Sequence, residues 1–177
     1  MNPIEFIEKY CQSEKQKHIL LTHSIAVANK ALAIARQHPE MQADEQFIKE
    51  AALLHDIGIV RVNAPAIECY GKDTYIRHGI LGAEILRNEG LERHALVCER
   101  HTGTGLTLQQ IIGQGLPLPH CDMQPISIEE QIICFADKFF SKTRLESEKT
   151  VEQARRSLEK FGPDGLEKFD TWCALFL

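Results

Sequence analysis

Four side chains that can bind a metal ion fall on the apolar faces of predicted helices. They are His23, His55, Asp56 and Asp137. A buried carboxylate is costly unless a cation meets it. The nearest cation to Asp137 is Lys138, which helix geometry directs about 100° away. A metal ion would neutralise the carboxylate and hold the imidazoles, so the pattern predicts a metal site.

The adjacent pair His55 and Asp56 could serve two metal ions. Neighbouring helical residues point about 100° apart, so the pair could hold one ion that lies between their directions. A carboxylate has two oxygens, and the second oxygen of Asp56 could bridge to another ion. His78 and His101 lie at the ends of predicted helices and could complete that second site. Each group could also be a hydrogen-bonded core residue, and position on an apolar face does not decide between the two interpretations.

These groups must be positioned by helices, because apolar residues repeat at helical spacing along most of the chain. A helix with a wide apolar face is expected around His23, and Pro39 is expected to end it. A second helix is expected from about residue 44 to 57, where Gly58 is placed to stop it. Further helices are expected over 77–88 and from 91 to about 101. Segments 59–76 and 102–126 are expected to be loops, with a short helix at 108–112.

A capping box at Ser127 and Glu130 predicts a helix that carries Asp137, continues through Phe140 and reaches about Leu145. Two more helices are expected over about 151–160 and 164–175. No segment alternates apolar and polar residues over the length of a strand, so the predicted fold class is all-α. The length predicts a single domain over residues 1–177.

The composition argues against several classes of protein. Of the 177 residues, 44% are apolar and 25% are charged, and the formal net charge is −5. A nucleic-acid surface usually needs a basic excess, so no nucleic-acid polymer is expected as a partner. The chain has no run of about 18 apolar residues and no secretory leader, so no membrane association is expected. Six scattered cysteines without a CxxC pair indicate reduced thiols and a cytoplasmic location.

The order of the candidate ligands resembles the signature of the HD-domain metal-dependent phosphohydrolases. The likeness is carried by LLTHSIAVANKALAIA around His23, EAALLHDIGI around the His-Asp pair, and IICFADK around Asp137. It covers about residues 18–145 and implies a helical bundle. Residues 146–177 lie outside it and are expected only to pack on that core.

The resemblance also implies a metal centre. A first ion would be bound by His23, His55, Asp56 and Asp137. A second ion would be bound by His78 and His101, with Asp56 as the bridge. His55 and Asp56 are then the catalytic pair. The mixed nitrogen and oxygen ligands suit one or two divalent ions of Fe, Mn, Ni, Co, Zn or Mg.

The implied activity is hydrolysis of a phosphate ester or anhydride by a metal-activated water. The substrate would be a nucleotide or another small phosphorylated metabolite, and the protein would act as a monomer or homodimer. HG-x-x-GA at 78–83 and H-T-G at 101–103 are similar to the bacterial hydrolases that split diadenosine tetraphosphate symmetrically. The chain has no G-Y-P string after His101, which disfavours cleavage of cyclic di-GMP. The alternatives are a di-iron oxygenase on the same helical core and a non-catalytic nucleotide sensor.

Phosphate groups need cationic or hydroxyl donors, and candidates stand near the expected ligands. They are Arg100, Thr102, Lys138, Lys142 and Arg144. The alternative is that the cations among them are ordinary solvated charges, as exposed Lys and Arg usually are. His120 lies in the loop before the Asp137 helix and is expected to be a surface histidine rather than another ligand.

Overall fold

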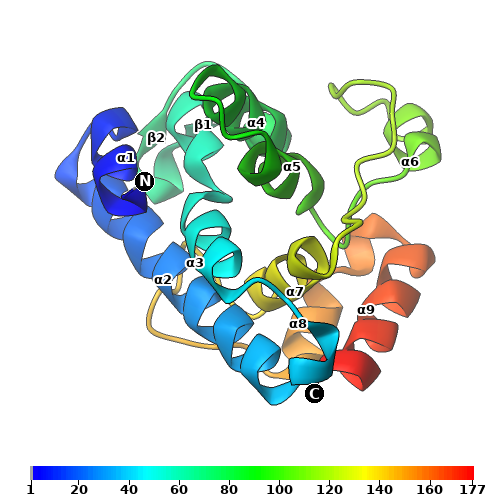
Figure 1. The fold of residues 1–177 in the computed structure, drawn as a ribbon. Coiled ribbons are helices and arrows are strands. Elements are labelled where there is room, and N and C mark those ends of the chain that lie inside the picture. Colours follow the sequence, from blue (N-terminus) through cyan, green and yellow to red (C-terminus); the bar gives the residue numbers. More distant parts are fainter. Residues whose placement is uncertain (1) are drawn as a thin grey trace.

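The computed structural model describes residues 2–177, and most of them are helical (Figure 1). The α-helices are α1 (Pro3–Tyr10), α2 (Glu14–Gln37), α3 (Glu45–Leu54), α4 (His78–Asn88), α5 (Glu92–Arg100), α6 (Leu108–Gly113), α7 (Ile128–Asp137), α8 (Val151–Ser157) and α9 (Pro163–Phe176). Two short antiparallel strands, β1 (Asn63–Ala64) and β2 (Cys69–Tyr70), form the one sheet in the described part of the chain. The predicted all-α, single-domain fold is confirmed.

Polar side chains cap the N-termini of several helices. Asn2, Ser13 and Asp44 cap α1, α2 and α3, and each accepts a hydrogen bond from a backbone N–H two or three residues further on. Ser127 and Glu130 form the predicted capping box of α7. Helix α1 was not among the predicted helices, although its Asn cap followed by Pro is a typical start of a helix.

The capping box of α7 can be tested through stability. Ser127 Oγ accepts a hydrogen bond from the backbone N–H of Glu130 at 3.2 Å. We expect Ser127→Ala to lower the free energy of unfolding by about 1 kcal/mol, because that N–H loses its partner. Urea unfolding measures the difference. Ser147→Ala is the control, since Ser147 is exposed and caps no helix; a loss no larger than the control's would contradict the capping role.

Two apolar clusters fill the interior, and the candidate ligands lie where they meet. The first cluster joins α3, α7, α8, α9 and the second half of α2, and the second cluster joins α1, α4, α5 and the first half of α2. On α2, Leu20 belongs to the second cluster and Val27 to the first, so His23 stands at the boundary between them. At the end of α3, Leu53 belongs to the first cluster, and Ile57, which follows the His-Asp pair, belongs to the second.

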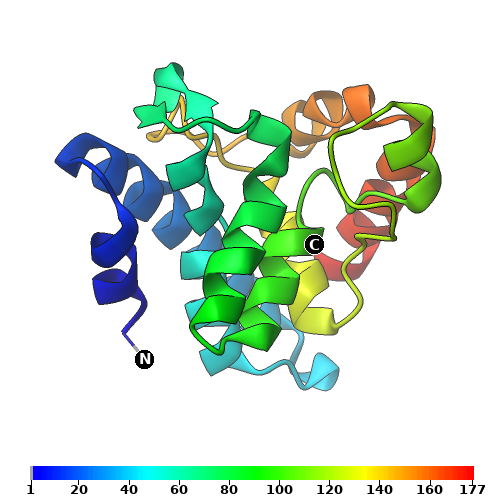
Figure 2. The same cartoon turned by 90° about the horizontal axis from the view of Figure 1, so that it is seen from above.

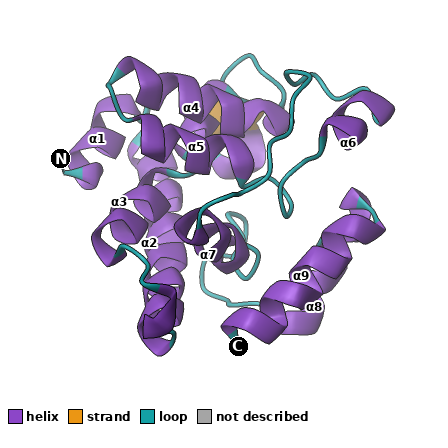
Figure 3. Cartoon of the chain, turned by 45° about the vertical axis from the view of Figure 1, so that its right-hand side comes forward, coloured by secondary structure: helices purple, strands orange, loops and turns teal. Residues whose placement is uncertain are grey.

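The C-terminal helices pack on the rest of the bundle through aromatic side chains. Figure 3 shows α8 and α9 running together beside α7, on the opposite side of it from α4 and α5. The ring of Phe135 on α7 lies 5.4 Å from that of Phe169 and 5.3 Å from that of Phe176. α4 and α5 lie side by side in two perpendicular views (Figures 1 and 2). The bundle thus has helices on both sides of the central pair α2 and α7.

The prediction that Gly58 ends the second helix is wrong. The α-helix α3 ends at Leu54, and the chain continues through a 3₁₀ helix, η2 (Ile57–Arg61), that contains Gly58. A Cβ on Gly58 would lie 1.9 Å from the carbonyl oxygen of His78 and 2.4 Å from the backbone nitrogen of Gly82. Gly58 is therefore required by the close approach of η2 to α4, and not by a helix end.

The helix that carries Asp137 is also shorter than predicted. α7 ends at Asp137, and its last turn tightens through hydrogen bonds such as Phe140 N–H to Asp137 C=O, 3.1 Å between N and O. Residues 141–149 then run as turns and irregular chain rather than as the predicted helix to about Leu145. This change of direction has a chemical consequence, because it returns Lys142 to the candidate ligands.

α2 is long and apolar enough, judged by length and composition alone, to cross a membrane. Core helices of soluble proteins pass the same test. In this structure 44% of its 18-residue apolar window is buried inside the bundle, including Leu20 and Val27. The buried face packs on α3 and α7, which is the arrangement of a core helix.

Candidate metal centre

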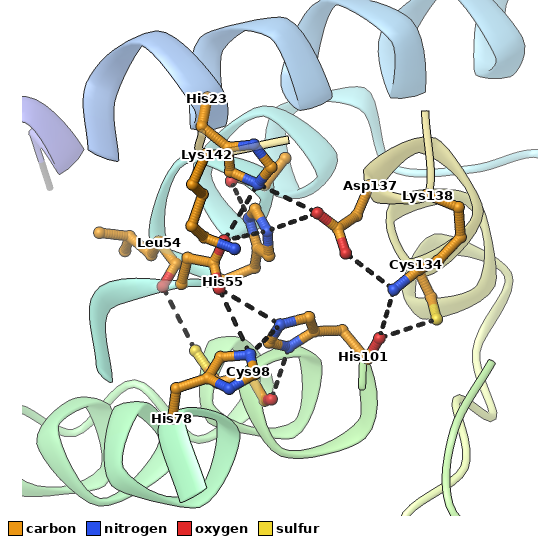
Figure 4. Close-up of polar contacts among 12 residues, drawn as sticks. His23, Leu54, His55, His78, Cys98, His101, Cys134, Asp137, Lys138 and Lys142 are labelled. Atoms are coloured by element: carbon orange, nitrogen blue, oxygen red, sulfur yellow. Dashed lines mark hydrogen bonds and ion pairs between the residues drawn. The ribbon is translucent and has the colours of Figure 1, made fainter. Parts of the chain in front are cut away.

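The structure brings together the four residues expected to bind a first metal ion. His23 comes from the middle of α2, His55 and Asp56 from the end of α3, and Asp137 from the last residue of α7. His23 Nε2 lies 3.0 Å from Asp56 Oδ2 and 3.0 Å from Asp137 Oδ1. His55 Nε2 lies 3.0 Å from Asp56 Oδ2 and 3.5 Å from Asp137 Oδ1. Figure 4 shows the side chains of His23, His55 and Asp137 pointing toward one another.

A second group forms around the other oxygen of Asp56. His78 Nε2 lies 3.5 Å and His101 Nε2 lies 3.4 Å from Asp56 Oδ1. His78 begins α4 and His101 directly follows α5, and both side chains are buried. The two groups together contain the six residues expected as ligands, and the Asp56 carboxylate belongs to both.

Backbone carbonyls orient three of the four imidazoles. His55 Nδ1 lies 2.7 Å from the carbonyl oxygen of Ala52, and His78 and His101 make the same contact with the residue three positions before them. A carbonyl oxygen can only accept, so each Nδ1 carries a proton and donates it. In the neutral imidazole this contact leaves Nε2 with a lone pair that can bind a metal ion, and hydrogen bonds of this kind orient metal-binding histidines.

The second group fits a cation. His78 Nε2 and His101 Nε2 face each other at 3.0 Å. With both Nδ1 atoms protonated, two neutral imidazoles would point lone pairs at one another, and only a shared proton or a metal ion relieves that repulsion. Both oxygens of Asp56 and Nε2 of His55 are also buried without a hydrogen-bond partner of good geometry. The donor set therefore suits divalent metal ions.

The expectation that Lys138 is directed away from Asp137 is wrong. Lys138 Nζ lies 2.8 Å from Asp137 Oδ2, and it also donates to the carbonyl oxygen of His101 at 2.9 Å. Lys142 Nζ lies 2.6 Å from Asp56 Oδ2 and 3.1 Å from the hydroxyl of Tyr75. Lys138 is the C-cap of α7 and still has helical backbone angles, φ −63° and ψ −21°, so its long side chain, rather than the end of the helix, brings Nζ to Asp137. Lys142 reaches Asp56 because the chain leaves the helix after Asp137.

The pKa shifts place most of the groups in the protonation states of ligands. Burial raises the pKa of Asp56 and Asp137, but the neighbouring lysines and imidazoles outweigh burial and hold both pKa values well below the usual range. Burial lowers the pKa of His78 to about 3, and it also lowers the pKa of His101. At neutral pH both carboxylates are therefore ionised and these two imidazoles are neutral.

His55 behaves differently. Burial disfavours its charged form, but the carboxylates of Asp56 and Asp137 outweigh burial and raise the pKa of His55 to about 9. Without a metal ion, His55 therefore holds a proton on Nε2 at neutral pH. That proton occupies the position from which the imidazole would bind a metal.

A cavity of about 400 Å³ opens onto both groups of candidate ligands, with His78, His101 and Asp137 in its wall. Among the residues expected to bind substrate, Lys138, Lys142 and Thr102 line this cavity. Arg100 and Arg144 do not line it. Arg100 instead pairs with Glu130 at 3.0 Å, and Arg144 lines a neighbouring cavity.

Sequence reasoning missed several residues of the cavity wall, among them three with polar groups that could contact a ligand. Tyr75 stacks on His78 with 4.7 Å between ring centroids and accepts a hydrogen bond from Lys142. Lys149 and Lys160 come from the segment expected only to pack. Their residue types can bind an anion, but nothing in the sequence around them indicates that they line a cavity. His120 is exposed and belongs to neither group of ligands, as expected.

Comparison with known proteins agrees with this geometry. The HD domain family matches residues 20–141. The chain is 35% identical over 148 residues to "Uncharacterized protein MJ0778" of Methanocaldococcus jannaschii, covering 81% of this chain and 80% of that protein. It is 32% identical over 155 residues to a tRNA (cytidine(56)-2'-O)-methyltransferase of Thermoplasma volcanium, and the match covers 86% of this chain but only 40% of the methyltransferase.

Two solved structures have a similar fold. One is the HD domain of the L. monocytogenes phosphodiesterase PgpH in complex with cyclic-di-AMP, with a TM-score of 0.55 and 16% identity over 96% of this chain and 92% of that one. The other is a second crystal structure of the same PgpH HD domain, with a TM-score of 0.53 and 16% identity over 99% of both chains. At this identity the likeness describes the fold.

Proposed function

The chain belongs to the HD-domain family, and from that premise we propose that it is a metal-dependent phosphohydrolase. The proposed reaction is hydrolysis of a phosphate ester or anhydride in a nucleotide or another small phosphorylated metabolite. One observation carries the proposal: the two oxygens of Asp56 face two separate groups of ligand atoms. A shared carboxylate of this kind suits a pair of ions that clamp the oxygens of one phosphoryl group.

The proposed ligands divide between two ions. One ion would be held by His23, His55, Asp56 Oδ2 and Asp137 Oδ1, and the other by Asp56 Oδ1, His78 and His101. Divalent ions bound there supply a water of lowered pKa as the nucleophile and positive charge for the phosphoryl oxygens. Such ligands suit divalent ions of Fe, Mn, Ni, Co, Zn or Mg. The metal analysis described below also determines whether one ion or two are bound.

Residues of the chain would bind and orient the phosphate. Lys142 and Lys138 direct their ammonium groups to the carboxylates of the site, and both line the cavity. When metal ions neutralise Asp56 and Asp137, these two ammonium groups become available to phosphate oxygens. Tyr75 packs on His78 and excludes water from one face of its ring. Thr102 adds a hydroxyl at the cavity wall.

The size and charge of the site favour a small nucleotide over a nucleic-acid polymer. A cavity of about 400 Å³ in a chain of net charge −5 matches a compact anionic ligand rather than an extended strand. Cyclic-di-AMP, bound by one structure of similar fold, is a small nucleotide. All six cysteines are free thiols, which agrees with action in the reducing cytoplasm. We expect the protein to work there as a monomer or homodimer.

Metal affinity should depend on pH because of His55. Its pKa of about 9 means that a metal ion must displace a proton from Nε2 at neutral pH. We expect the apparent affinity for Mn²⁺ to rise about tenfold per pH unit between pH 7 and 9 and to level off above pH 9. Competition with a chromophoric chelator at four pH values measures this. An affinity that stays constant across that range would show that His55 binds no metal.

The proposal itself is tested by metal analysis followed by activity assays. Purified protein is analysed for bound metals and then assayed on a panel of phosphorylated metabolites with Mn, Co, Ni and Mg. Metal-dependent phosphate release supports the proposal. Bound iron with oxygen uptake and no phosphate release would favour the di-iron oxygenase. Tight nucleotide binding without turnover at full metal occupancy would favour the sensor.

A further inference from the structure

The cavity beside the candidate metal centre has a wall that lies outside the part of the chain matched by the HD family. The family match ends at residue 141. Beyond it, Lys149, Ser157, Lys160 and Phe161 line the same cavity as His101. Lys160 and Phe161 belong to a short 3₁₀ helix, η5 (Glu159–Phe161), between α8 and α9. The C-terminal segment therefore contributes directly to the cavity and does more than pack on the core.

The cavity wall carries an excess of positive charge. Four lysines line it, and Asp137 is the one acidic residue among the described residues that do so. Lys138 and Lys142 are paired with the carboxylates of the metal centre. For Lys149 and Lys160, no carboxylate within residues 2–177 lies at ion-pair distance. Lys149 and Lys160 thus line the cavity without a counter-charge, and Lys160, which is exposed, places its Nζ 5.1 Å from the centroid of the Phe161 ring.

Lys149 is held close to the other lysines. Its Nζ donates to the carbonyl oxygen of Lys138 at 3.3 Å. Burial lowers the pKa of Lys149, and although Asp137 raises this pKa, the ammonium groups of Lys138, Lys160 and Lys142 lower it further. An anion placed among these groups would relieve their mutual repulsion.

The segment that carries Lys160 is fixed next to His101. Gln110 Nε2 donates to the carbonyl oxygen of Phe161 at 2.9 Å. Gly103, two residues after His101, lies so close to Phe161 that a Cβ would be 3.1 Å from its ring. η5 is thus attached to the chain that follows a candidate metal ligand, and its position relative to the metal centre is set by packing.

We propose that Lys149 and Lys160 form a second phosphate subsite, which binds a phosphate group other than the one that is cleaved. The inference rests on the proposed function and deepens it, because the substrate would carry at least two phosphate groups, as in a nucleotide with a phosphoanhydride chain. A substrate with one phosphate would contact the metal centre, Lys138 and Lys142. It would leave the ammonium groups of Lys149 and Lys160 without an anionic partner.

The test compares inorganic tripolyphosphate with inorganic phosphate as ligands, measured by titration calorimetry. The full-length chain is used free of metal, because tripolyphosphate chelates divalent ions. We expect wild type to bind tripolyphosphate at least about tenfold more tightly than phosphate, and the double variant Lys149→Ala/Lys160→Ala to lose at least about tenfold in tripolyphosphate affinity. Lys149→Arg/Lys160→Arg should retain most of the affinity, since the charges remain.

The matched control is Lys15→Ala/Lys49→Ala, which removes the same two charges from exposed positions outside the cavity. It should bind tripolyphosphate within about twofold of wild type. The subsite is overturned if the two alanine pairs lose equal affinity, or if wild type does not prefer tripolyphosphate. This result is independent of turnover: a protein that binds tripolyphosphate through these lysines but hydrolyses nothing contradicts the proposed function alone.

Discussion

Asp56→Asn should cost more activity than any other single substitution in the metal centre, with kcat for metal-dependent phosphate release falling by about 10³-fold or more, equivalent to about 4 kcal/mol. Asp56 is the one carboxylate in the described chain whose two oxygens face both groups of ligand atoms. The amide of Asn keeps the shape of the side chain but carries no charge, so it cannot bridge two cations. Metal content per chain should fall together with kcat, and metal analysis of the purified variant measures this.

The control for Asp56→Asn is another buried carboxylate that lies outside the cavity. Glu130 is buried and paired with Arg100 at 3.0 Å, and Gln can replace it in the capping box of α7. Glu130→Gln should therefore keep the metal content and kcat of wild type. Full metal content in Asp56→Asn, with more than a tenth of wild-type kcat, would show that Asp56 is not the bridge.

Gly58→Ala should strongly destabilise the protein. Its Cβ would meet two backbone atoms of α4, at 1.9 Å from His78 O and 2.4 Å from Gly82 N. Backbone cannot rotate away as a flexible side chain can, so η2 and α4 must separate. We expect the free energy of unfolding to fall by about 3 kcal/mol or more, or the chain not to fold.

Separation of η2 from α4 would also move His78, the first residue of α4. If Gly58→Ala folds, it should therefore bind metal ions more weakly than wild type. Gly113→Ala is the matched control, because Gly113 ends α6 and a Cβ there meets no atom within 4 Å. The control should change stability by less than about 1 kcal/mol. Equal thermal stability of both variants would contradict the close approach.

The positions of the candidate ligands could be predicted because the signals are local. Helical spacing placed His23 and Asp137 on apolar faces, and in the structure both lie where the two apolar clusters meet. The prediction that His78 and His101 join Asp56 also agrees with the geometry. Whether these groups bind metal ions is a proposal that metal analysis tests.

Lys138 and Lys142 were candidate phosphate donors, but their pairing with Asp137 and Asp56 could not be predicted, and for Lys142 it depends on where α7 ends. A capping box indicates where a helix begins, but residues 138–145 contain no glycine or proline that would mark its end. The tight turn after Asp137 brings Lys142 to Asp56, 86 positions away in the chain by residue number. Helical periodicity continued through this region would have placed Lys142 elsewhere.

The sequence by itself determined the helical class, the starts of the helices from α3 onward, and a set of candidate ligands whose residue types suit a divalent metal. These properties follow from capping, periodicity and side-chain chemistry, which are properties of neighbouring residues. Only the tertiary structure decided that Gly58 serves the packing of η2 on α4, that Lys138 and Lys142 pair with the carboxylates, and that Lys149 and Lys160 line the cavity. Each of these depends on the approach of segments far apart in the chain, and no local pattern encodes which segments will meet.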